Sequence, residues 1–273
     1  MTALIVTIIV LVVLFILWVL ALRCRSGHAA WETLRKFRYA HRGLHDSKNG
    51  IPENSMAAFR LAADNGYGIE LDIHLTRDGR LAVIHDNSLL RTAGVDVKAC
   101  DLTAEELGQY RLEGTDEKIP FLEEVLPLFE GKAPIIVELK VEGNAAALAK
   151  AACEMLDQYK VDYCIESFHP QAIIWLKKHR PEICRGQLSQ NFLKDQGTGL
   201  GKAADFAMTH LLTSFLAVPD FIAYNHQHRN RWSLKLAKAI WRVQEVNWTI
   251  RTPEAMNACE SDGSLSIFEN FKP

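Results

Sequence analysis

The chain has 273 residues, of which 48% are hydrophobic and 23% charged, and its formal net charge at pH 7 is -2. These values exclude a disordered, collagen-like or coiled-coil chain, and the near-neutral charge predicts no nucleic-acid partner. Charge is nevertheless unevenly spread, because residues 1–42 hold six Lys/Arg and one Asp/Glu while the remainder carries -7. The length fits one large domain of the size of a barrel. Six scattered cysteines without a C-x-x-C pair indicate free thiols rather than a zinc or redox motif.

The N-terminus is strongly apolar. Residues 1–22 contain no charged side chain, and residues 3–22 form an almost unbroken apolar run. Twenty helical residues extend about 30 Å, which matches the hydrocarbon core of a bilayer. The alternative is a cleaved signal peptide, which typically has a charged start, a shorter apolar region and a small-residue cleavage site. Since none of these is found here, we predict a transmembrane anchor over residues 1–24.

Basic residues follow the apolar run and predict the topology of the anchor. Five Lys/Arg occur between Arg23 and Arg38, and we interpret residues 25–35 as a juxtamembrane basic linker. Under the positive-inside rule this flank faces the cytoplasm. The prediction is a single-pass membrane protein with a cytoplasmic catalytic domain over residues 36–273. Lipidation of Cys24 remains an alternative to an ordinary juxtamembrane thiol.

Short apolar runs alternate with helical stretches through the rest of the chain. Eight runs are typical of strands: Phe37–Ala40, Ile69–Leu75, Ala133–Leu139, Val161–Ile165, Ile183–Leu188, Phe221–Tyr224, Val243–Trp248 and Leu265–Phe268. Six helical stretches are predicted: Ser55–Asn65, Asn144–Tyr159, Pro170–His179, Lys202–Leu216, Ser233–Trp241 and Pro253–Cys259. This alternation indicates a parallel α/β sheet, and eight units indicate a (β/α)8 TIM barrel. Few residues follow the last strand, so we expect the final helix to be missing.

One segment breaks the alternation after the second strand. Arg80–His85 follows that strand too closely for a crossover helix, and Asp78-Gly79 is a strong hairpin signal. A two-residue turn there would place Asp72 opposite His85. Residues from about 87 to 120 then form a small insertion, which we expect to cover the barrel mouth.

Charged side chains end several strands, where a barrel carries its active site. Glu70 and Asp72 are two residues apart and share one face of their strand, and Glu138 ends the third strand. Three converging carboxylates repel one another unless a cation neutralises them, and oxygen ligands favour Ca²⁺ or Mg²⁺. His41 and His85 also end strands, and histidines exchange protons near neutral pH. The pattern predicts a metal centre flanked by two acid/base groups.

Arg42 and Lys140 lie beside these residues and provide the positive charge that suits a phosphate group. Taken singly, each strand-end residue has an ordinary explanation as a helix cap, a surface ion pair or a structural histidine. Their joint occurrence at aligned strand ends favours a shared site.

In chain order these motifs resemble those of the glycerophosphodiester phosphodiesterase family. The resemblance is dense over residues 38–140 and continues thinly through Glu166–Phe168 and Trp248-Thr249. It is carried by His41–Gly43, Pro52–Ser55, Ala58-Phe59, Glu70–Ile73, Thr76-x-Asp78-Gly79, His85-Asp86, Leu89-x-Arg91-Thr92, Ile119–Leu126 and Glu138–Lys140.

The resemblance implies a TIM barrel that hydrolyses a glycerophosphodiester to an alcohol and glycerol 3-phosphate. The implied roles are general acid and base for His41 and His85, divalent-metal binding for Glu70, Asp72 and Glu138, and phosphate contact for Arg42 and Lys140. Which histidine is the acid, and whether water or a substrate hydroxyl is the nucleophile, stay open.

Several further positions have weaker implied roles. Glu53 matches a supporting carboxylate, while Asn54 is equally explained as the N-cap of the next helix. Trp248 matches an aromatic at the mouth, with a core tryptophan as the alternative. The tail Ser266–Asn270 and Arg251 depart from the family pattern, which we expect to affect the substrate end of the pocket and not the metal centre.

Three other functions are alternatives. A lysophospholipase-D-type reaction on lysophospholipids suits a membrane-anchored chain and predicts an apolar groove near residues 87–120. Phosphoinositide-type phospholipase chemistry would stop at a cyclic product. A catalytically inactive, membrane-tethered binding module is disfavoured, because a suitable residue stands at every metal and acid/base position.

Overall fold

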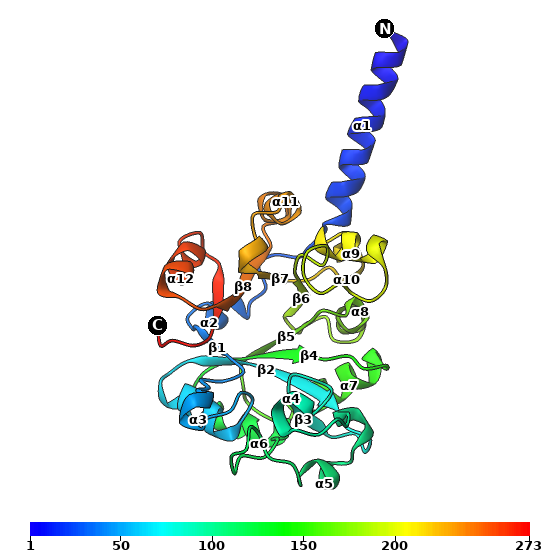
Figure 1. The fold of residues 1–273 in the computed structure, drawn as a ribbon. Helices are drawn as coiled ribbons and strands as arrows, with labels where there is room; N and C mark the ends of the chain where they lie inside the picture. The colour runs from blue at the N-terminus through cyan, green and yellow to red at the C-terminus, as the bar shows by residue number, and fades with distance from the viewer.

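Eight parallel strands close into a barrel in the computed structural model, which describes residues 1–273 (Figure 1). In chain order they are β1 (Tyr39–His41), β2 (Gly68–Leu75), β4 (Ile135–Leu139), β5 (Tyr163–Ser167), β6 (Arg185–Ser189), β7 (Phe221–Asn225), β8 (Gln244–Ile250) and β9 (Leu265–Phe268). β9 pairs with β1, and β1 with β2, all in parallel. The TIM-barrel prediction is confirmed, and each of the eight predicted runs overlaps one of these strands.

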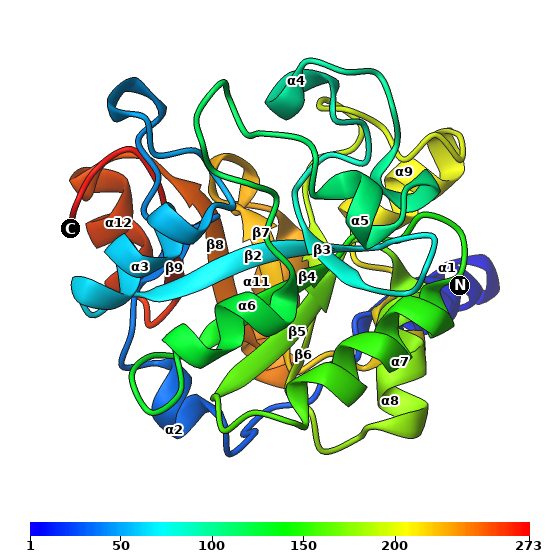
Figure 2. The same ribbon diagram turned by 90° about the horizontal axis from the view of Figure 1, so that it is seen from below.

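Helices follow most strands and cover the outside of the barrel (Figure 2). They are α3 (Met56–Asp64), α6 (Leu122–Val125), α7 (Ala145–Leu156), α8 (Pro170–His179), α9 (Lys202–Thr209), α10 (Ser214–Ala217), α11 (Trp232–Trp241) and α12 (Pro253–Glu260). The predicted single helix over residues 202–216 is wrong, because Leu211 adopts a left-handed φ of 59° that ends α9 and separates it from α10. No helix follows β9, as expected.

The barrel has an apolar interior that is separate from the larger core between sheet and helices. α2 (Trp31–Leu34) closes the amino-terminal end of the barrel, where the Trp31 ring packs edge-on against Phe221 at 5.4 Å. Residues 25–35 are therefore packed against the barrel. Figure 2 shows α2 at one end of the barrel and α4 and α9 at the other. With one end plugged by apolar side chains, only the carboxyl end of the strands is left to hold a polar site.

The hairpin after β2 has a different register from the predicted one. β3 (Leu81–Val83) pairs antiparallel with β2 and brings Ala82 opposite His74. The turn has three residues rather than two, because Gly79 adopts a φ of +83° and adds a left-handed residue after the bend. The N–H of Ile84 consequently donates to the Asp72 carbonyl at 3.0 Å, so His85 lies one residue beyond the predicted position.

The insertion after β3 forms a small unit with its own core. It contains α4 (Leu90–Ala93), a 3-10 turn (Ala99–Asp101) and α5 (Ala104–Leu107). Its apolar side chains point inward into one cluster, and Leu90 is its only exposed large apolar residue. The apolar groove predicted for this insertion is therefore not found there.

One long helix, α1 (Thr2–Ala21), projects from the barrel on the side where α9, α10 and α11 lie (Figure 1). Its mean hydropathy is 3.4 and none of it is buried, so it is a candidate membrane span. The helix is joined firmly to the barrel. Leu22 is fully buried, Trp241 Nε1 donates to the Val19 carbonyl at 3.0 Å, and Arg25 binds the buried Asp220 through Nη2 at 2.8 Å.

Candidate active site

Three acidic side chains converge inside the carboxyl end of the barrel. Alternate residues of β2 point inward, which places Glu70 and Asp72 inside, and the β2–β4 register sets Glu138 beside Asp72. One oxygen from each carboxylate lies within 4.8 Å of the others, and all three residues are buried. The structure thus brings together the three carboxylates predicted to bind metal.

The electrostatics of this cluster fit a divalent cation. Burial, and then the nearby charges of Asp72 and Glu138, raise the pKa of Glu70 well above its usual range. Burial works against the charged form of Asp72, but the Lys140 ammonium 3.0 Å away lowers its pKa well below the usual value. The negative potential of the three carboxylates is therefore larger than Lys140 and Arg42 neutralise. An all-oxygen donor set with this excess charge suits Ca²⁺ or Mg²⁺.

Two cations border the carboxylates. Lys140 Nζ lies 2.8 Å from Glu138 Oε2. Arg42 donates its main-chain N–H to Glu70 Oε2 at 3.2 Å and its Nη1 to Glu53 Oε1 at 2.9 Å. The predicted anion-binding pair thus stands at the edge of the acidic cluster, with Glu53 holding the guanidinium.

Tight backbone packing fixes the Arg42 loop. Gly43 follows with a φ of +79°, and a Cβ there would meet Ala58 and Phe59 at 2.9 Å.

Asn54 is not the N-cap of α3; Ser55 takes that place by accepting the Ala58 N–H. Instead Asn54 is buried and donates Nδ2 to Asp72 Oδ2 at 2.9 Å. Its contact with an acidic residue was not predicted, because an Asn before Ser looks like an ordinary capping pair.

His41 ends β1 and is held from behind by the tail of the chain. Its Nδ1 lies 2.6 Å from Glu269 Oε2, and its Nε2 lies 3.9 Å from Glu70 Oε2. Arg251 Nε donates to the other Glu269 oxygen at 2.6 Å. Burial lowers the pKa of His41 to about 4, against the raising effect of Glu269. Arg251 and Glu269, which belong to the positions that depart from the family pattern, thus contact one another and a predicted catalytic histidine, so their effect is not confined to the substrate end.

His85, like His41, has its Nδ1 on a carboxylate that orients the ring. Its Nδ1 lies 2.6 Å from Asp86 Oδ1, and Asp86 Oδ2 accepts from Arg91 Nε at 2.5 Å. Arg91 also donates Nη2 to Glu53 at 2.6 Å, which links this group to Arg42. Each predicted acid/base histidine therefore has its Nδ1 on a carboxylate that an arginine holds, and its Nε2 left available.

Two more buried ionisable groups adjoin the site. Glu166 on β5 pairs in register with Glu138, and its Oε2 has no hydrogen-bond partner. Burial, and then the charge of Glu138, raise its pKa well above the usual range. His74 lies on β2 with Nε2 3.0 Å from the His85 carbonyl, and burial lowers its pKa to about 4. Neither group was predicted as part of the site, although their inward strand positions were the available signal.

Trp248 lies on β8 at the mouth, where it is partly buried. Its ring packs edge-on against Phe168 at 5.5 Å, and Phe168 packs on Phe192 at 6.0 Å. The Trp248 Nε1 has no hydrogen-bond partner. The tryptophan is thus part of an aromatic wall next to the acidic cluster.

An apolar groove of about 720 Å³ runs from the acidic cluster to the outer helices. At one end it is lined by His85, Glu138 and Lys140, and at the other by apolar side chains that include Met208 of α9 and Leu216 of α10. The insertion contributes only Asn87, so the groove is formed by the segments after β4, β5 and β6 and not by the predicted insertion.

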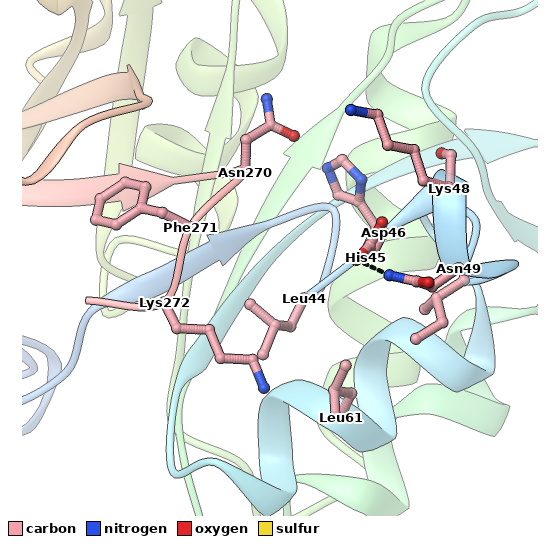
Figure 3. A pocket seen from close by; sticks show the side chains of 11 residues that line it. Leu44, His45, Asp46, Lys48, Asn49, Leu61, Asn270, Phe271 and Lys272 are labelled. Atoms are coloured by element: carbon pink, nitrogen blue, oxygen red, sulfur yellow. Dashed lines mark hydrogen bonds between the residues drawn. The ribbon is translucent and has the colours of Figure 1, made fainter.

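A second cavity, of about 770 Å³, lies outside the mouth between the loop after β1 and the tail (Figure 3). Lys48 and Lys272 line it, together with His45 and Asn270. His45 Nε2 lies 3.7 Å from Glu269 Oε2, so this cavity is next to the carboxylate that holds His41. None of the predicted site residues lines it.

The sequence profile described as the "Glycerophosphoryl diester phosphodiesterase family" matches residues 41–268. The chain belongs to this family. Membership confirms the resemblance and the expectation of an enzyme of the phosphoric diester hydrolase class. Glycerophosphodiester phosphodiesterase 1 of Mus musculus is 30% identical over 269 residues, covering 85% of this chain and 77% of the mouse protein.

Another relative is Lysophospholipase D GDPD1 of Rattus norvegicus. It is 38% identical over 124 residues, which covers 41% of this chain and 38% of the rat protein. Among solved structures, an Oleispira antarctica phosphodiesterase in complex with the product sn-glycerol-3-phosphate has a TM-score of 0.71 at 24% identity. The alignment covers 90% of this chain and 95% of that structure, and it shows the common fold.

Proposed function

We propose that this family member is a membrane-anchored, divalent-metal-dependent enzyme that hydrolyses glycerophosphodiesters to an alcohol and glycerol 3-phosphate. The observation that carries the proposal is the convergence of three buried carboxylates, two cationic side chains and two oriented histidines at one end of the barrel. Family membership supports the reaction class.

In this proposal Glu70, Asp72 and Glu138 hold Ca²⁺ or Mg²⁺. Such an ion, when bound, supplies a Lewis acid that stabilises negative charge on a phosphate oxygen. Arg42 and Lys140 orient the phosphate from the edge of the cluster, where they already contact the carboxylates. Glu53 supports them by fixing the Arg42 guanidinium.

The two histidines move protons at their Nε2 atoms. In each, Nδ1 donates to a carboxylate, so the tautomer and the ring orientation are fixed. One Nε2 accepts the proton of the nucleophilic oxygen, and the other donates a proton to the departing alkoxide. Trp248 and the adjoining aromatic wall cover the glycerol side of the substrate.

The anchor in this proposal is α1, and the barrel faces the cytoplasm. The length and apolarity of α1 support the first part, and the Lys/Arg residues between 23 and 38 support the second under the positive-inside rule. The product would then be released on the cytoplasmic side of the membrane.

The test measures glycerol 3-phosphate release from glycerophosphocholine by the full-length chain in lipid nanodiscs. The full chain is used because Leu22 and Arg25 pack into the barrel. We expect turnover that EDTA removes and that Ca²⁺ or Mg²⁺ restores. His41→Ala and Glu70→Ala should each lower the rate roughly 10²- to 10⁴-fold. The exposed Glu254→Ala on α12 is the matched control, and a rate indifferent to EDTA or to both site variants contradicts the proposal.

The apolar groove supports a second substrate class, lysophospholipids cleaved in a lysophospholipase-D-type reaction. The groove leads from Glu138 and Lys140 to α9 and α10, and its volume of about 720 Å³ accepts an acyl chain. Ala207→Trp should fill the groove and slow choline release from lysophosphatidylcholine while sparing glycerophosphocholine. Ala146→Trp on the exposed face of α7, which does not line the groove, is the control. Equal effects of Ala207→Trp on both substrates would contradict a role of the groove in chain binding.

A further inference from the structure

The exposed apolar side chains of the barrel are confined to one region. After residue 21, eight large apolar residues are exposed, and seven of them lie between Leu193 and Ile240. They include Phe206 of α9, Phe215 of α10 and Trp232 of α11, of which Trp232 is 78% exposed. Scattered apolar residues on a surface are normal, whereas their concentration on neighbouring elements marks a contact surface.

These elements surround the base of α1. Leu22, at the end of α1, shares a buried cluster with Leu211 after α9 and Leu234 of α11. Trp241 at the end of α11 is bonded to α1 through the Val19 carbonyl. Figure 1 shows α9, α10 and α11 on the side of the barrel from which α1 leaves. Because these contacts between the end of α1 and the barrel are tightly packed, α9, α10 and α11 hold a fixed position along the axis of α1.

The same region has a charge that differs from the rest of the chain. Residues 190–242 contain seven Lys/Arg and three Asp/Glu, a net charge of +4, although the whole chain carries -2. Five of the seven basic residues form no ion pair with the protein, because Arg229 and Lys238 are the only Lys/Arg of this stretch that pair with a carboxylate. The five are Lys194, Lys202, Arg231, Lys235 and Arg242. One of the three acidic residues, Asp220, is buried against Arg25. The exposed charge of the region is thus strongly positive.

Exposed aromatic and basic side chains in one layer are characteristic of a membrane interface. Tryptophan concentrates at the level of the headgroups, and unpaired Lys and Arg are attracted to anionic lipids. Trp232 and Lys235 are neighbours on α11, with Nζ 5.8 Å from the ring centroid. A second copy of the chain does not explain the unpaired positive charge, because the same surface on the other copy would repel it.

We propose that α9, α10, α11 and the loop before α9 form a membrane-docking surface that rests in the headgroup layer of the bilayer crossed by α1 and binds anionic phospholipids. This inference rests on the proposed membrane anchoring. Leu200 and Leu216, which line the far end of the apolar groove, belong to the same surface. The groove therefore opens at the bilayer, and a lipid substrate reaches the acidic cluster without crossing water.

The test is quenching of tryptophan fluorescence by phospholipids brominated near the headgroup end of the acyl chains. The full-length chain is placed in nanodiscs of phosphatidylcholine, alone or mixed with phosphatidylglycerol. The chain has six tryptophans. If Trp232 and the joint residues Trp18 and Trp241 lie at the interface and emit equally, about one half of the emission is quenched, and Trp232→Phe lowers this to about two fifths. If Trp232 lies in water, about one third is quenched and the same variant raises the fraction to about two fifths.

Trp31→Phe is the control, because Trp31 is buried in the barrel far from any lipid and its removal should raise the quenched fraction. A second variant, Lys235→Glu with Arg242→Glu, should lower the quenched fraction in the discs that contain phosphatidylglycerol, because it removes the positive charge that binds anionic lipid. The exposed Lys132→Glu near β4 should leave that fraction unchanged. A rise of the quenched fraction in Trp232→Phe, or no effect of the double charge reversal, overturns the proposal. Neither measurement needs turnover, and loss of the chain from the discs would show instead that α1 is no anchor.

Discussion

Replacing Glu269 by Gln tests whether the carboxylate behind His41 positions it for catalysis. Glu269 Oε2 lies 2.6 Å from His41 Nδ1, and its side chain is only 10% exposed. Gln has nearly the same shape, so the packing of the tail should survive. The negative charge and the obligatory acceptor are lost, and the amide is able to present N–H to Nδ1, which favours the wrong tautomer of His41.

The expected size of the effect follows from the bond that is lost. A hydrogen bond to a charged partner contributes about 1.5–3 kcal/mol. The low exposure of Glu269 leaves little screening, so we apply this range without reduction. At about 1.4 kcal/mol per factor of ten, kcat should fall roughly 10- to 150-fold.

The assay is steady-state hydrolysis of glycerophosphocholine in the presence of saturating Ca²⁺ or Mg²⁺. We expect kcat to fall with KM nearly unchanged, because Glu269 acts through His41. Glu269→Asp should recover part of the rate, since it keeps the charge. Arg251→Gln should have a smaller effect. The arginine side chain is 54% exposed and forms an ion pair with Glu269, so its loss should change kcat by less than about threefold.

A Glu269→Gln enzyme with kcat within about threefold of the natural chain would refute this reasoning. It would mean that packing alone orients His41. A rise of KM equal to the fall in kcat/KM would equally refute it, because the residue would then contact substrate.

Three further predictions concern stability. Gly43→Ala should cost about 2–4 kcal/mol in chemical denaturation, because it forces a side chain into a left-handed conformation and against Phe59. Burial raises the pKa of Glu245, but a hydrogen bond from Arg229 outweighs this, so the pKa in the folded state is lower than the ordinary value. The ionised carboxylate therefore stabilises the fold at pH values above its ordinary pKa, and this stabilisation is lost as the pH falls through the pKa of the folded state. Glu245→Gln should therefore reduce Tm at neutral pH and flatten its decline in acid. Saturating Ca²⁺ should raise Tm by binding the folded state, and Glu70→Gln should remove most of that shift in differential scanning calorimetry.

Much of the fold could be predicted because barrel strands leave a regular signal. Each strand reads as a short apolar run, and Pro170–His179 was predicted to the residue because a proline starts the helix. Features set by single backbone dihedrals were not predicted. The left-handed Leu211 splits one helix into α9 and α10, and the left-handed Gly79 shifts the hairpin register by one residue. Leu211 is an apolar residue in an apolar stretch, and Asp78-Gly79 suits a three-residue turn as well as a two-residue one, so the sequence pattern does not fix either dihedral.

The candidate site was likewise predictable in part: some of its residues are marked by a local sequence pattern and others are not. The spacing of two residues predicts that Glu70 and Asp72 lie on the same face of their strand, and the structure brings them together with Glu138. Their metal-binding role stays a prediction. The partner of His85 was visible as the next residue, Asp86, whereas the partner of His41 is 228 residues away. Only the closing of the barrel brings Glu269 to β1, so no local pattern marks it.

The joint between α1 and the barrel has a consequence for biosynthesis. α1 is synthesised before the barrel, yet the residues that Arg25 and Val19 contact, Asp220 and Trp241, follow them by 195 and 222 residues. Closure of the barrel likewise requires β9, which pairs with β1. Contacts this distant in sequence form late and slowly. The hydrophobic helix therefore lacks its contacts with the barrel until Asp220 and Trp241 have been synthesised, and the barrel closes only after β9 has been made.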